Sequence, residues 1–221
     1  MNKEDVKLSG IITDKNKVPL ENADVFLMNS NFEDICKTKT DQYGKYTIIV
    51  EKGLDYLLAI VKDYSVKFLE YWVWNLPLLE DVEINACIDG LEVYAINVFR
   101  IQGAFPALTV YFRPMSLHRA KNKQENDKLK QRNLNDISPK LVKSDIDVFI
   151  DNEKVEVYEI NKVNEYTGLE EGYHQSMCGY LMQIQMPKNF DKTKYFKIDI
   201  KIRDTETDEY GEGTVFWKLC N

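Results

Sequence analysis

Hydrophobic and polar residues alternate with a period of two along most of this chain. The alternation is clearest over residues 196–203, where four apolar side chains alternate with four charged ones, and it recurs over 180–186 and 215–219. A β-strand with one buried face produces this pattern, because successive side chains point to opposite faces of the sheet. The pattern therefore predicts an almost entirely β fold.

Short polar segments separate these runs, as turns between strands do. Residues 14–17 and 41–44 are two such segments, and residues 151–154 (DNEK) lie between the alternating segments 145–150 and 155–163. Asp and Asn favour tight turns because their side chains can accept hydrogen bonds from nearby backbone amides. The last segment therefore predicts a β-hairpin.

Two stretches depart from simple alternation. Residues 56–61 (YLLAIV) are apolar at every position, which predicts a central strand covered on both faces. In 155–163 the apolar phase shifts between Val157 and Tyr158. A β-bulge at that point would account for the shift.

Composition and charge narrow the class of protein. The chain has 221 residues, of which 44% are hydrophobic, so it has ample material for a core. Its formal net charge is −7, which disfavours binding to a nucleic-acid backbone. No apolar run approaches the roughly 20 residues that a transmembrane helix needs, so we expect no membrane insertion.

The first ten residues (MNKEDVKLSG) lack the apolar segment of a secretory signal. As it stands, the chain is expected in the cytoplasm. A location at the cell surface or outside the cell is the alternative if a leading segment has been removed.

We expect two tandem β-sandwich domains, residues 1–89 and 90–221, because a turn-like segment at residues 88–91 divides the strands into two groups. The second group contains a polar insertion at about residues 117–140 that lacks both strand alternation and a helical apolar stripe. This insertion predicts a long solvated loop or a short exposed helix. Its basic side chains could also bind an acidic partner.

Three short motifs in the first half occur in a recognisable order. They are Gly10-Ile11-Ile12-Thr13-Asp14, Pro19-Leu20-Glu21-Asn22-Ala23-Asp24-Val25 and Thr40-Asp41-Gln42-Tyr43-Gly44-Lys45-Tyr46. With these motifs, residues 6–88 resemble the carboxypeptidase regulatory-like domain, a transthyretin-like (prealbumin-like) β-sandwich.

The resemblance implies a non-catalytic accessory module, since such domains accompany peptidases, receptors and cell-surface proteins. It does not imply peptidase activity, because the chain has no room for the catalytic domain. The second half resembles no family that we can name. Its strands are enough for an immunoglobulin-like sandwich, although the Cys…Trp…Cys spacing of immunoglobulin domains is absent.

The four cysteines form no CxxC pair. They fit best as small buried side chains. The alternative is one disulfide in each half, Cys36–Cys87 and Cys178–Cys220, which would need an oxidising compartment.

Residues 204–212 form the most acidic stretch of the chain. Asp204, Glu206 and Asp208 supply the hard oxygen ligands that calcium prefers, so a Ca²⁺ site on a hairpin tip is one hypothesis. The spacing of an EF-hand is absent, and a solvated acidic turn is the simpler interpretation.

The most aromatic strand expected is 66–76. Trp72 and Trp74 fall on one face together with Phe68, whereas Tyr71 falls on the other. The two tryptophans, or Tyr71 if its face is open, could form a flat platform for sugar rings. Burial in the core or at the domain junction is the alternative.

No sequence motif for nucleophilic catalysis or nucleotide binding is present, so we do not expect an enzyme. The leading hypothesis is a binding or structural module that contacts another protein, for example within a larger assembly or a cell-surface complex. The alternative is a carbohydrate-binding module that uses the aromatic platform, and a calcium-dependent adhesion role ranks third.

Overall fold

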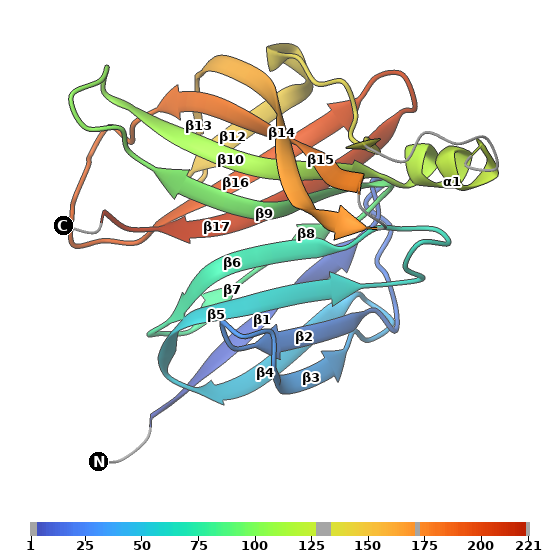
Figure 1. Ribbon diagram of the computed structural model, residues 1–221. Helices are drawn as coiled ribbons and strands as arrows, with labels where there is room; N and C mark the ends of the chain where they lie inside the picture. Colours follow the sequence, from blue (N-terminus) through green and yellow to red (C-terminus); the bar gives the residue numbers. More distant parts are fainter. Residues whose placement is uncertain (1–3, 127–133, 171–172, 220–221) are drawn as a thin grey trace.

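The fold of the computed structural model is almost entirely β, which confirms the all-β prediction (Figure 1). The structure describes residues 4–126, 134–170 and 173–219. In chain order the elements are β1 (Asp5–Thr13), β2 (Asp24–Met28), β3 (Asp34–Lys39), β4 (Lys45–Glu51), β5 (Gly53–Val61), β6 (Tyr71–Leu78), β7 (Val82–Glu83), β8 (Ala86–Cys87), β9 (Leu91–Phe99), β10 (Ala107–Ser116), α1 (Leu117–Asn126), β11 (Leu134–Asn135), a 3₁₀ turn (Lys143–Asp145), β12 (Ile146–Ile150), β13 (Glu153–Val155), β14 (Val157–Glu170), β15 (Tyr173–Gln185), β16 (Phe196–Asp204) and β17 (Glu209–Trp217).

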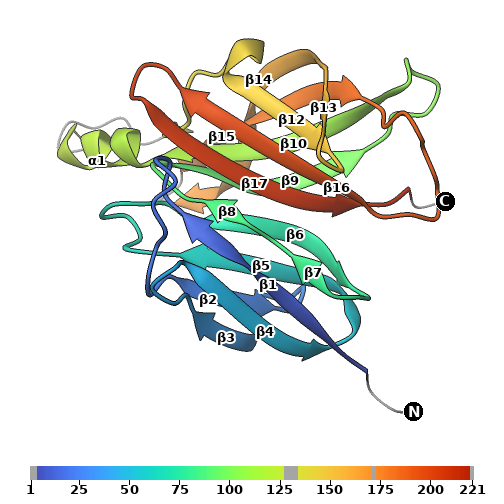
Figure 2. The same ribbon diagram turned by 180° about the vertical axis from the view of Figure 1, so that it is seen from behind.

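The described strands form three sheets. The largest has eight strands in the order β13-β12-β16-β17-β6-β5-β2-β3. A second sheet, with the order β4-β1-β7 and with β8 also paired to β1, lies against its β6-β5-β2-β3 part. A third, with the order β11-β15-β10-β9 and with β14 added to β15, lies against the β12-β16-β17 part. Figures 1 and 2 show the resulting two halves one above the other.

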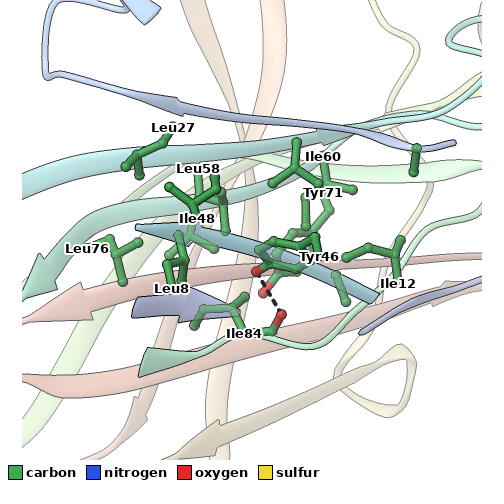
Figure 3. Close-up of a cluster of buried hydrophobic side chains, with 14 of the residues drawn as sticks. Leu8, Ile12, Leu27, Tyr46, Ile48, Leu58, Ile60, Tyr71, Leu76 and Ile84 are labelled. Atoms are coloured by element: carbon green, nitrogen blue, oxygen red, sulfur yellow. Dashed lines mark hydrogen bonds between the residues drawn. The ribbon is translucent and has the colours of Figure 1, made fainter. Parts of the chain in front are cut away.

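Each half has its own hydrophobic core. The first core draws its buried side chains from Val6 to Ile88, and the second from Leu91 to Trp217. Strand β4 shows how the sequence builds the first, since Tyr46 and its period-two neighbours are buried and alternate with exposed side chains. The Tyr46 hydroxyl donates a 2.9 Å hydrogen bond to the carbonyl oxygen of Ile84 (Figure 3). The domain boundary near residue 89 remains our proposal.

The two halves share one sheet, a feature that the sequence did not predict. Strand β17 of the second half pairs in parallel with β6 of the first, with Val73 opposite Thr214. The Thr214 hydroxyl donates a 2.5 Å hydrogen bond to Asp199. Because the Thr214 proton is used in that bond, the Thr214 oxygen accepts a hydrogen bond from the buried Tyr71 hydroxyl, which lies 2.7 Å from it. This polar chain joins the first core to strands β17 and β16 of the second half.

Strand β9 crosses close to β17 because two glycines leave room for it. A Cβ atom on Gly211 would lie 2.5 Å from the carbonyl oxygen of Leu91, and one on Gly213 would lie 2.8 Å from that of Val93. Both distances are shorter than van der Waals contact, so any side chain at these positions would push the strands apart.

The predicted strand at residues 66–76 begins later than expected. Backbone hydrogen bonds from Val66 and Lys67 to the carbonyl of Asp63 form a turn, and β6 starts only at Tyr71. Phe68 therefore packs in the first core and not beside the two tryptophans, so its predicted place on their face was wrong. The expected central strand at 56–61 is confirmed, because β5 lies between β2 and β6.

The predicted hairpin after residue 150 forms between β12 and β13. The strand predicted at 155–163, however, divides between two sheets, since β13 pairs with β12 and β14 pairs with β15. A register shift between Val157 and Glu159 confirms the predicted bulge. The bulge follows the point at which the chain crosses from one sheet to the other.

The polar insertion contains the short helix α1, one of the two expected states. Ser116 caps its first turn by accepting a hydrogen bond from the Arg119 amide. Residues 127–133 of the insertion lie outside the described part of the chain. No described helix is both long and apolar enough to cross a membrane.

Cys36, Cys87 and Cys178 are free thiols, and Cys87 and Cys178 are buried as expected, so the alternative of a Cys36–Cys87 disulfide is wrong. Cys220, the proposed partner of Cys178, lies outside the described residues.

We predict that Tyr71→Phe lowers the free energy of unfolding by about 1–3 kcal/mol, because it leaves the buried Thr214 oxygen without its donor. Urea denaturation followed by circular dichroism measures the loss. A double-mutant cycle with Thr214→Val should give a coupling energy of at least about 0.5 kcal/mol. Additive effects of the two substitutions would contradict this role for the polar chain.

Candidate functional site

Four aromatic side chains meet on the outer face of the shared sheet, where the two halves join. We call Phe32, Trp72, Trp74 and Tyr94 the aromatic cluster. Trp72 and Trp74 are two residues apart on β6, so they share a face, and their rings stack with centroids 5.5 Å apart. The Tyr94 ring on β9 has its centroid 5.4 Å from that of Trp72 and 5.2 Å from that of Trp74. The centroid of the Phe32 ring, from the β2–β3 turn, lies 6.1 Å from each of the two.

The two tryptophans predicted to form a sugar platform do lie together, but their ring faces are not accessible enough to serve as one. Trp72 is only 8% exposed and Trp74 is half-buried, because both rings contact Phe32 and Tyr94 edge-on. Tyr71 is 2% exposed and lies in the first core, so it offers no platform on the other face. Within the cluster, Phe32 is the most accessible ring, at 49% exposed.

A pair of carboxyl groups borders the aromatic cluster. Glu92 shares a face of β9 with Tyr94 and is 2% exposed. Glu70 precedes β6 and accepts a 3.0 Å hydrogen bond from the Trp72 indole. Burial, and secondarily the charge of Glu70, raises the pKa of Glu92 to about 8. Burial also raises the pKa of Glu70.

Two buried polar atoms, one in the Glu92 carboxyl group and one in the aromatic cluster, lack hydrogen-bond partners within the described part of the chain. They are Oε2 of Glu92 and the indole Nε1 of Trp74. A buried group without a partner costs about 1–3 kcal/mol, so such groups are rare in a purely structural core.

An arginine and a tyrosine on β10 extend the surface beside Tyr94. The Arg113 guanidinium lies 5.8 Å from the Tyr94 ring centroid and donates a 2.6 Å hydrogen bond to Glu165 on β14. The Tyr111 hydroxyl donates to the same carboxylate. Burial, followed by the Glu165 carboxylate, raises the pKa of Tyr111 to about 12, so the phenol stays protonated.

This arrangement is suited to binding by contact. Tryptophan, tyrosine and arginine are the residue types that carry most of the energy at protein interfaces. Among the described residues, no group of three His, Cys, Asp or Glu side chains could hold a metal ion.

The acidic turn between β16 and β17 does not gather its carboxylates around a common point. Asp204 and Glu206 each accept a 2.7 Å hydrogen bond from the Arg119 guanidinium, whereas Asp208 accepts one of 2.6 Å from Arg203. Burial is the largest single influence and would raise the pKa of Asp204, but the hydrogen bonds from Arg119 and the Glu206 amide, together with the Arg119 charge, outweigh it and lower the pKa. The turn is therefore a salt-bridged anchor for α1, and the geometry does not favour the calcium hypothesis.

Sequence reasoning missed Phe32, Tyr94 and Glu92. The period-two pattern of β9 places Glu92 and Tyr94 on the face opposite Leu91 and Val93, so their common orientation could be predicted. Their position beside β6 depends on the pairing of strands far apart in the sequence.

Comparison with known proteins identifies no family. No family model matches the chain, and no curated protein matches it. Similar solved structures include a DUF3823 family protein from Parabacteroides merdae, at 13% identity and a TM-score of 0.30, covering 98% of this chain and 100% of the other. A protein from Bacteroides uniformis, provisionally described as carbohydrate-binding, matches at 12% identity and a TM-score of 0.32, covering 97% and 99%.

The major pilin subunit of Bacillus cereus matches at 13% identity and a TM-score of 0.32, with 96% of this chain and 69% of that chain covered. At these identities and TM-scores, the similarities carry no inference about ligand, partner or activity.

We predict that neither millimolar Ca²⁺ nor EDTA shifts the thermal midpoint by more than about 1 °C, since a ligand stabilises only a protein that binds it. The physical reason is that Arg119 already occupies the carboxylates of Asp204 and Glu206. Differential scanning fluorimetry tests this. A saturable rise in the midpoint with Ca²⁺ would contradict it.

We predict that wild-type stability declines as the pH rises from about 4.5 towards 8. The folded state retains the Glu92 proton over that interval whereas the unfolded state releases it. Glu92→Gln cannot release this proton, so its free energy of unfolding should fall less between pH 5 and pH 8 than that of wild type. The difference between the two falls should be about 1–3 kcal/mol. Urea midpoints at the two pH values measure it, with the exposed Glu21→Gln as control. Parallel pH profiles for wild type and Glu92→Gln would exclude this role.

Proposed function

We propose that this chain is a non-catalytic binding module that contacts a partner protein through the aromatic cluster. Residues 6–88 would form a carboxypeptidase regulatory-like sandwich, and the second sandwich would complete the contact surface. The observation that carries the proposal is the half-exposed Phe32 ring, which lies on two tryptophans and is backed by a buried apolar base.

The base of the cluster is apolar and well packed. Met28, Leu57 and Ala59 are buried on the same outer face of the sheet as Trp72, and Phe26 packs against them. A rigid apolar base of this kind lets a partner gain contact area without ordering flexible side chains.

A protein partner fits this surface better than a sugar does. A pyranose ring stacks on an open aromatic face, and Trp72 has almost no accessible face. An apolar side chain of a partner needs only the accessible ring of Phe32 and the half-buried edges of Trp74 and Tyr94.

Contact through side chains is also favoured over strand addition at β3. This strand ends the eight-stranded sheet, so its outer edge has no pairing partner among the described strands. Lys37 and Lys39 lie on it and both pair with Asp24. Lysines on an edge strand typically discourage the addition of another strand.

We predict that a photo-crosslinking amino acid at position 32 captures a discrete protein in cells that produce this chain. The same group at position 49 should not capture that protein. Ile49 is a matched control because it is 60% exposed and lies on β4, in a different sheet. Mass spectrometry of the adducts identifies the partner.

Once the captured partner is purified, Phe32→Ala should weaken the affinity of this chain for it by at least about tenfold, the loss typical of an interface anchor. Ile49→Ala should leave the affinity unchanged. Circular dichroism would verify that both variants fold. The same adducts from both positions, or equal affinities for both variants, would refute the proposal.

A further inference from the structure

A concave site lies beside Asn75 of β6 and is separate from the aromatic cluster. It is a groove of about 740 Å³ lined by the β5–β6 strands, the β9–β10 loop, the end of β17 and the loop before β16. We call it the junction groove. None of its lining residues belongs to the aromatic cluster. Its volume falls in the range of about 300–1,000 Å³ that is usual for ligand sites.

The groove is locally positive in a chain that is negative as a whole. Arg100, Lys192 and Lys218 line it, against one carboxylate, that of Asp55, whereas the formal net charge of the chain is −7. Arg100 and Lys192 are both exposed, whereas the Lys218 ammonium lies 5.2 Å from the centroid of the Tyr195 ring. Cations gathered in a concave surface raise the local concentration of an anionic ligand.

The remaining lining is suited to a ligand rich in hydroxyl groups. The side-chain amides of Asn75 and Gln102 can each donate and accept a hydrogen bond, as a hydroxyl group does. Asp55 adds an acceptor. Phe99, which is 44% exposed, contributes aromatic surface that can pack against C–H groups.

From this combination we propose that the junction groove binds an acidic oligosaccharide, with uronate carboxylates on the cations and hydroxyl groups on the amides. A neutral sugar would leave the charges of Arg100 and Lys192 unmatched. The exposed Phe99 ring favours a sugar over an acidic peptide, because a pyranose presents a flat C–H face that packs on an aromatic ring. This site is independent of the proposed protein contact.

The test is calorimetric titration of the full chain with a trimer of galacturonic acid. We expect saturable binding that weakens as the salt concentration increases, because the cations contribute through charge. The galactose trimer, which has the same ring without the carboxylate, should bind at least about tenfold more weakly. The triglutamate peptide, which matches the charge without the sugar hydroxyls, should also bind at least about tenfold more weakly.

Variants locate the site. Lys192→Gln and Arg100→Gln should each weaken binding of the uronate trimer at least about threefold, and together about tenfold or more. Gln102→Ala should weaken it without changing the salt dependence, because it removes an uncharged contact. Lys45→Gln, at an exposed position of β4, is the matched control and should have no effect. Phe32→Ala should also have no effect, which separates this site from the protein contact.

Three outcomes would overturn the proposal. One is the absence of binding of the uronate trimer at millimolar concentration. Another is equal affinity for triglutamate, which would mean that the groove recognises charge alone. The third is binding that is insensitive to the groove variants when circular dichroism shows them to be folded.

Discussion

The parallel pairing of β17 with β6 is the contact on which the rest of the architecture depends. It joins two sandwiches, each with its own core, into one eight-stranded sheet. A sheet that continues across a domain junction fixes the relative orientation of the two halves more firmly than a flexible linker does. The buried hydrogen bond from Tyr71 to Thr214 reinforces this, because it joins β6 to β17 directly and is lost if the two strands separate.

That constraint explains the chemistry of the aromatic cluster. Because β9 passes closely over Gly211 and Gly213 of β17, its outward side chains reach β6. Glu92 is therefore buried against Glu70 and Trp72, and burial raises its pKa to about 8. A buried carboxyl group is costly in a core, and Glu92 lies beside the aromatic cluster, the surface that we propose as the protein contact.

The sequence predicted local features well because period-two alternation and turn residues act over a few neighbours. It identified the covered strand at 56–61 and the bulge after Val157. It misplaced the start of β6, because the turn at Asp63 depends on backbone hydrogen bonds that side-chain type does not reveal. It could not reveal that β17 pairs with β6, which requires contact between residues about 140 positions apart, as in Tyr71 with Thr214.

Adjacent residues of β6 serve the two proposed sites. Trp74 belongs to the aromatic cluster, whereas Asn75 lines the junction groove. Successive side chains of a strand point to opposite sides, and the left-handed conformation of Asn75, with φ of 55°, redirects the chain locally. One strand can thus present a protein contact and a ligand groove without the two competing for the same surface. Since β17 holds β6 in place, the shared sheet is the common support of both sites.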